Sequence, residues 1–199
     1  MVRLPPPLPL TLPLTDLLAG VAMGMAVMVS PCAVLAGDVS QPEHKPAGFE
    51  LRAGLFAHDP TSPEPRGVDI SAEILLPRLP GPAGFETWMP RLHAGGMAAT
   101  AGGTSYGYAG LTWSVDLTRT LFVEAALGGA VSNAPTGPYG PPDRSALGCR
   151  GAFREAASVG VRITPQLSML GTLEHLSNAG LCSSNRGLST VGVRVGYSF

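Results

Sequence analysis

Apolar and polar residues alternate one by one along most of the chain after residue 48. In residues 49–58, for example, Leu51 and Leu55 alternate with Glu50 and Arg52. A period of two is typical of a β-strand whose two faces meet different surroundings. Comparable runs occur at about 68–76, 88–98, 108–117, 121–132, 153–163, 167–174 and 190–199. The pattern therefore predicts eight strands, of a length (about 10 residues) that lets a tilted strand cross a bilayer.

The two faces of these predicted strands differ sharply in charge. One face carries almost no charge, as contact with lipid requires. The other carries charges of both signs: Glu50, Arg52, Asp69, Glu73, Arg91, Asp116, Glu124, Arg154, Arg162, Glu174 and Arg194. Opposite charges can pair inside a closed barrel. We therefore expect an all-β fold, an eight-stranded antiparallel transmembrane β-barrel over residues 37–199; a soluble barrel or sandwich with the same alternation is the alternative.

The connections between the strands favour the outer membrane. Short links at 118–119 and 164–166 alternate with long ones at 58–67, 133–150 and 178–187. Short periplasmic turns and longer outer loops are typical of outer-membrane barrels. The terminal Phe199 also resembles the signal read by the machinery that assembles such barrels.

The first 36 residues have the features of a removable export signal. A single positive charge, Arg3, precedes an almost entirely apolar stretch from Leu17 to Ala36, and small residues precede Asp38. This order is typical of a signal peptide with its cleavage site. A transmembrane anchor is the alternative, but Pro31 interrupts the stretch. We expect residues 1–36 to be removed.

Composition narrows the function classes. The formal charge is −1 with 14% charged residues, so no basic surface suggests nucleic acid. There is no Cys-x-x-Cys and no His/Cys cluster with metal-ligand spacing, so no metal is expected. Cys149 and Cys182 flank the predicted sixth and seventh strands, and an exported protein meets an oxidising compartment. We expect them to form a disulfide; free thiols are the alternative.

Three polar residues break the apolar face near one end of the sixth and seventh strands. Pairing these strands across the 164–166 turn puts Glu155 directly opposite His175, with Ser177 on the same face. A serine becomes a nucleophile when a histidine removes its proton, and a third group orients the histidine. The patch therefore suggests catalysis; the alternative is three polar residues at the level of the lipid headgroups.

Residues 175–180 read His-Leu-Ser-Asn-Ala-Gly, residues 185–187 read Asn-Arg-Gly, and the chain ends Gly-Tyr-Ser-Phe. This segment resembles the lipid A 3-O-deacylase family of outer-membrane barrels. The resemblance implies a hydrolase that releases a 3-hydroxy fatty acid from position 3 of lipid A, without a cofactor. It implies Ser177 as nucleophile, His175 as general base, and Asn178 and Gly180 as oxyanion donors. It also allows a homodimer.

One position departs from the family. The family has a glutamate fourteen residues after the histidine, whereas this chain has Ser189 there. A hydroxyl can orient an imidazole but stabilises an imidazolium less well than a carboxylate. Our hypothesis is that Glu155 supplies the acid from the opposite strand; alternatively it pairs with Arg150 or Arg154.

Two further functions stay open at this point. The chain could be a non-catalytic structural or adhesion barrel that lacks a working acid, or an esterase acting on another acyl lipid. The remaining candidates for chemistry, His58 and His93, are expected to be interior or rim groups.

Overall fold

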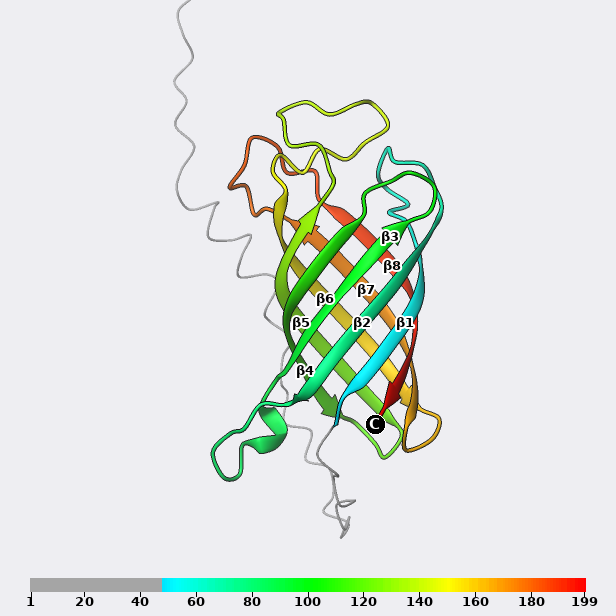
Figure 1. Ribbon diagram of the computed structural model, residues 1–199, viewed down its shortest axis with the longest axis vertical. Coiled ribbons are helices and arrows are strands. Elements are labelled where there is room, and N and C mark those ends of the chain that lie inside the picture. The colour runs from blue at the N-terminus through cyan, green and yellow to red at the C-terminus, as the bar shows by residue number, and fades with distance from the viewer. Residues whose placement is uncertain (1–47) are drawn as a thin grey trace, which may run out of the picture. The chain divides into compact units, whose positions relative to one another are not determined.

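The computed structural model describes residues 48–199, which form one closed barrel of antiparallel strands (Figure 1). The strands are β1 (Glu50–Ala57), β2 (Val68–Arg78), β3 (Arg91–Ala99), β4 (Tyr106–Asp116), β5 (Leu121–Ser132), β6 (Gly151–Arg162), β7 (Leu167–Ser177) and β8 (Leu188–Ser198). Each strand pairs with its neighbour in the chain, and β8 closes the barrel on β1, with Ala53 opposite Val195. The predicted fold class is confirmed. The predicted signal peptide, residues 1–36, lies outside the described residues.

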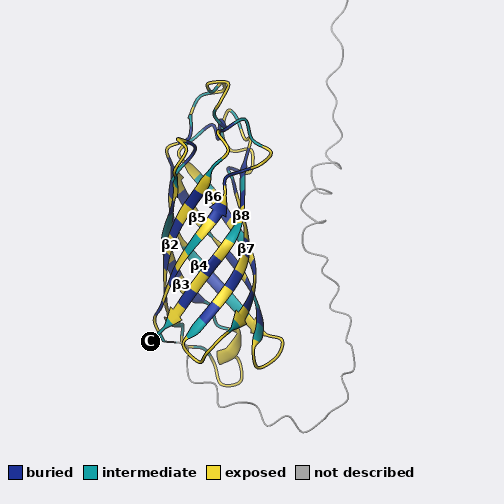
Figure 2. Ribbon diagram, turned by 90° about the vertical axis from the view of Figure 1, so that its right-hand side faces the viewer, coloured by how far each residue is buried: buried dark blue, intermediate teal, exposed yellow. Residues whose placement is uncertain are grey.

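Alternate residues of every strand face opposite environments. Leu55 and Leu173 are exposed on the outside, whereas Arg52 and Glu174 are buried inside. Figure 2 shows the result as buried and exposed bands that alternate along the strands. In residues 48–199, no helix is long and apolar enough to cross a membrane.

Ion pairs and aromatic rings fill the barrel. Arg52 donates to Glu50 at 2.7 Å and to Glu124 at 2.6 Å. Glu174 accepts from Arg154 at 2.7 Å and from Arg194. The Arg154 guanidinium lies 3.8 Å from the centre of the Tyr108 ring. Most of the charges that the sequence pattern assigned to one face thus pair in the interior, whereas Arg162 and Asp116 pair at 2.6 Å near one end of the barrel.

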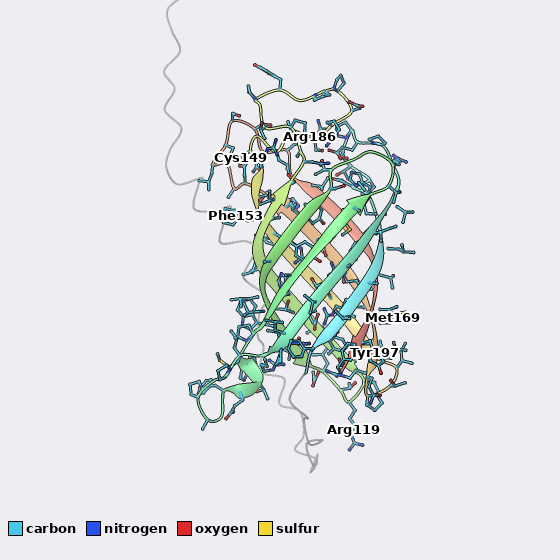
Figure 3. All side chains as sticks on the ribbon, viewed as in Figure 1. Arg119, Cys149, Phe153, Met169, Arg186 and Tyr197 are labelled. Atoms are coloured by element: carbon cyan, nitrogen blue, oxygen red, sulfur yellow. A yellow bond between two sulfur atoms is a disulfide. The ribbon has the colours of Figure 1, made fainter. Side chains whose placement is uncertain are left out.

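The two ends of the barrel differ as predicted. At one end, Thr118 and Thr164 each open a tight turn, and each side-chain oxygen accepts two backbone N–H groups ahead of it. The 58–67, 133–150 and 178–187 loops lie at the other end, whereas the 79–90 link with η1 lies at the same end as the tight turns (Figure 1). Figure 3 shows Arg119 at the first end and Arg186 at the second, together with Cys149 and Phe153.

The third strand begins later than its apolar run predicted. Trp88 ends a short 3-10 helix, η1 (Glu86–Trp88), and β3 begins only at Arg91. Pro90 has no N–H to donate to a ladder, so the strand cannot extend back through it. The prediction of a strand from residue 88 is therefore wrong by three residues at its start.

We expect Glu174→Gln to destabilise the barrel by about 3 kcal/mol or more, because it leaves two buried guanidinium groups without their shared carboxylate. The free energy of unfolding, measured by urea titration in detergent micelles, checks this. Glu155→Gln, an outward-facing change of the same kind on β6, is the control and should leave it unaltered. Equal stability of the two variants would contradict the role given to the interior network.

Candidate functional site

The polar patch predicted on the apolar face is assembled by the pairing of β6, β7 and β8. Glu155 lies opposite His175, and His175 lies opposite Ser189. Three consecutive strands thus present one row of polar groups at the end of the barrel that carries the long loops. The predicted register of Glu155 and His175 is confirmed.

His175 is held by its neighbour on β8. Its Nδ1 and Ser189 Oγ are 2.8 Å apart and share a hydrogen bond. Gly187 packs against the other side of the ring: a Cβ atom at Gly187 would lie 3.0 Å from Cε1 and 3.4 Å from Nε2. The backbone of Gly187 has a φ of 71°, which also favours glycine. The imidazole is therefore fixed with Nδ1 engaged.

Ser177 ends β7 on the same face as His175. It is half-buried and lies opposite Phe153 of β6. Within residues 48–199, no hydrogen bond joins Ser177 Oγ to the imidazole. In hydrolases without substrate this bond is often long and shortens when substrate binds.

The two predicted oxyanion donors are used inside their own loop. The Asn178 side chain is buried, and its Nδ2 donates to the carbonyl oxygens of Leu147 and Ser184. Its backbone N–H donates to Asn185 Oδ1 at 2.9 Å, and Gly180 N–H donates to Asn178 Oδ1 at 2.8 Å. Asn178 therefore braces the loop in this structure.

Two other donors lie close by in sequence. In the described part of the chain, Ala179 N–H and Asn185 Nδ2 make no hydrogen bond. Both residues belong to the segment that resembles the family, but the sequence indicates no role for them. The hydrogen bonds of the loop engage Asn178 and Gly180 but leave these two donors unused. No periodic pattern in the sequence predicts which loop donors are used in this way.

The loops on either side of the patch are tied together. Cys149 and Cys182 form the predicted disulfide, with their Cα atoms 6.0 Å apart. Ser184 Oγ and Arg186 N–H both donate to the carbonyl of Ala146. The 133–150 and 178–187 loops therefore form one unit above the site.

Glu155 is exposed and makes no hydrogen bond within the described residues. The alternative that it pairs with Arg154 is wrong, because Arg154 points inside the barrel to Glu174. Arg150, the other proposed partner, forms no ion pair in residues 48–199. Among the residues that the structure describes, the carboxylate opposite His175 thus has no partner.

A second polar cluster lies just past the ends of β1 and β2. The buried His58 is 2.8 Å from both Asp69 Oδ2 and Glu64 Oε2. Glu64 also accepts from Thr104 and from the backbone N–H of Ser145, which joins the 58–67, 100–105 and 133–150 connections. Burial lowers the pKa of His58, but its carboxylate partners outweigh burial and leave that pKa raised. His58 and His93 are both buried, as expected.

Asp59 connects this cluster to the candidate site. Its Oδ2 accepts the backbone N–H of Ser189 at 3.0 Å, and its Oδ1 accepts from Thr61. Burial raises the pKa of the Asp59 carboxyl, but the hydrogen bonds from Ser189 and Thr61 outweigh burial and hold the pKa below its ordinary value. Asp59 was not predicted from the sequence, because the Asp-Pro pair that opens the loop indicates only a turn.

An apolar groove of about 370 Å³ lies beside Ser177 on the outer face. Its walls come from β5, β6 and the disulfide: Gly128, Gly129, Cys149, Gly151, Ala152, Phe153, Asn178, Leu181 and Cys182. The groove borders Phe153, the residue opposite Ser177. Among residues 48–199, no group of His, Cys, Asp or Glu could hold a metal ion.

Comparison with known proteins identifies one family. The family model described as lipid A 3-O-deacylase (PagL) matches residues 85–198, more than half of the chain. The crystal structure of the outer membrane enzyme PagL superposes with a TM-score of 0.60 at 17% identity, covering 75% of this chain and 99% of that one. A de novo designed transmembrane β-barrel superposes with a TM-score of 0.52 at 13% identity, covering 79% of this chain and 100% of the design. No curated protein matches the sequence. At these identities the two structures support the fold alone.

We expect replacement of both cysteines by serine to lower the stability of the loop unit while leaving the barrel folded. The disulfide spans 33 residues, for which chain entropy gives about 4 kcal/mol. Because the linked segment holds β6 and β7, the urea midpoint of the barrel should fall, and protease susceptibility of the 133–150 loop should rise. A loop that resists protease as well as in the disulfide-bonded protein would contradict this.

Proposed function

This chain belongs to the lipid A 3-O-deacylase family, and we propose that it hydrolyses the ester at position 3 of lipid A with Ser177 as nucleophile and His175 as base. The observation that carries this proposal is the His175–Ser189 hydrogen bond on the lipid-facing surface, with Ser177 beside it. Polar groups on a lipid face are costly, so this polar row supports a catalytic role. The proposal places the enzyme in the outer membrane, with its site at the lipid surface.

We assign His175 the tautomer that carries its proton on Nδ1. With Nδ1–H donating to Ser189 Oγ, the lone pair of Nε2 is left to accept the proton of Ser177. Ser177 Oγ then attacks the ester carbonyl, and the tetrahedral intermediate collapses as His175 returns the proton to the sugar oxygen that leaves. Water, deprotonated by the same Nε2, cleaves the acyl-serine and releases the 3-hydroxy fatty acid.

The oxyanion of each tetrahedral intermediate needs hydrogen-bond donors. Asn178 and Gly180 were the donors expected from the family motif, and both are engaged in bracing the loop. Ala179 N–H and Asn185 Nδ2 are donors in the same loop that need break no bond. We assign the oxyanion role to this loop, with Asn178 holding its shape.

The groove beside Ser177 suits the acyl chain. Its lining is almost wholly apolar, and three glycines leave it open on the outer face of the barrel. A lipid lying in the membrane can slide an acyl chain into it without leaving the bilayer. A single copy of this chain presents both Ser177 and the groove to such a substrate, so the proposed geometry does not require a homodimer.

Mass spectrometry of lipid A from cells that express the wild type or Ser177→Ala tests the reaction. The wild type should remove one 3-hydroxyacyl group, and the variant should lose this activity by about 10³-fold or more because the nucleophile is gone. The variant must be shown to reach the outer membrane folded. Unchanged lipid A with both proteins would favour a non-catalytic barrel, and release from another acyl lipid would favour a different esterase.

Glu155→Gln tests the carboxylate opposite His175. We propose that this charge helps to stabilise the imidazolium across the strand pair. Because the carboxylate is exposed, its loss should lower kcat by only about fivefold. Release of fatty acid by the purified variant in mixed micelles measures this, and full activity would remove Glu155 from the mechanism.

A further inference from the structure

The proposed mechanism leaves one buried anion beside the site without a role. Asp59 is 5% exposed and lies in the loop that follows β1. In the part of the chain that the structure describes, no Arg or Lys forms an ion pair with it. An ionised carboxylate that is buried without a cationic partner is costly unless something compensates it.

The barrel's closure explains how Asp59 comes to this place. The ladder between β1 and β8 ends at Ala57 and Val191. Two residues further along the same register, Asp59 falls level with Ser189. Its Oδ2 accepts the Ser189 N–H at 3.0 Å, in place of the strand carbonyl that the ladder no longer supplies. Its Oδ1 accepts from the Thr61 hydroxyl at 2.7 Å and from the Thr61 N–H at 2.9 Å.

Ser189 therefore has an anion on one side and the imidazole on the other. Its Oγ is 2.8 Å from His175 Nδ1, and its backbone N–H is bonded to Asp59. This is the position at which the family resemblance leads one to expect a glutamate. A single residue separates His175 from a carboxylate held rigidly out of water.

We propose that Asp59 is a positioning residue that supplies, through Ser189, the negative charge missing from position 189. This inference rests on the proposed function. When His175 takes the proton of Ser177, the imidazolium forms next to Ser189, and the Asp59 carboxylate stabilises it. The proton stays on His175, and Asp59 only holds Ser189 in place and contributes its charge.

Because Asp59 is buried, its charge acts on the His175 imidazolium with less screening than the charge of Glu155. Glu155 lies opposite His175 but is exposed, so water and headgroups screen it. Asp59 is fixed by three hydrogen bonds in a buried loop, where screening is weaker. The neighbouring His58 has both ring nitrogens bonded to Asp69 and Glu64.

A backbone cap and an electrostatic role make different predictions. If Asp59 only caps the N–H of Ser189, a charge added elsewhere cannot replace it. If its charge matters, a carboxylate at position 189 can. Ser189→Glu leaves the backbone N–H of residue 189 unaltered and restores the family's acid beside Nδ1, so it separates the two roles.

The experiment measures release of 3-hydroxy fatty acid from lipid A micelles by the purified full barrel. Asp59→Asn should lower kcat by about tenfold or more with KM nearly unchanged, and should move the acid limb of the pH profile to lower pH. Asp59→Asn combined with Ser189→Glu should recover most of kcat. Asp143→Asn, the same change on an exposed loop at the same end, is the matched control and should leave both unaltered.

Each outcome decides the proposal. Full activity of Asp59→Asn, or a loss that Ser189→Glu does not repair, overturns it, the second in favour of a purely structural cap. Equal urea midpoints of all variants exclude misfolding as the cause of any loss. A wild type that releases no fatty acid overturns the proposed function first, and Glu155→Gln then shows no separate effect either.

Discussion

Hydrogen bonding of the backbone in an apolar solvent is the constraint on which the rest of this structure depends. Lipid offers no partner for N–H and C=O groups, so every strand that meets it must pair on both edges. Here β8 pairs with β1 and leaves no edge open. That closure sets one register around the whole barrel. The register in turn places Glu155, His175 and Ser189 in one row and brings the loop after β1 to the start of β8.

The same register explains why the site lies outside the barrel. Ion pairs and aromatic rings occupy the interior, and Glu174, one residue before His175, is part of that network. Alternation turns the next side chain outward, so neighbouring residues of β7 serve two separate purposes. A substrate with several acyl chains cannot enter an interior of this kind, whereas it can lie against the outer face beside Ser177.

Residues governed by a period were predictable from the sequence, and residues governed by loops were not. A period of two identified the strands, the charged interior and the opposition of Glu155 to His175, because a short turn leaves little freedom of register. The disulfide followed from the same pairing. The bracing role of Asn178 could not be predicted because a loop's hydrogen bonds follow no period: its amide donates to two carbonyls. Trp88 was misjudged because an apolar run does not reveal that Pro90 blocks the ladder.

Asp59 shows a deeper limit of the same kind. Its contact with Ser189 joins residues 130 positions apart, and only closure of the first strand on the last brings them together. No local turn sets that register, so the sequence gives no direct sign of it. The placement also has a physical logic. A carboxylate at position 189 would stand on the outer face among lipids, whereas at Asp59 it lies in a loop where N–H and hydroxyl donors satisfy it. A serine on the outer face with a buried acid behind it keeps the anion near the imidazole and out of the lipid.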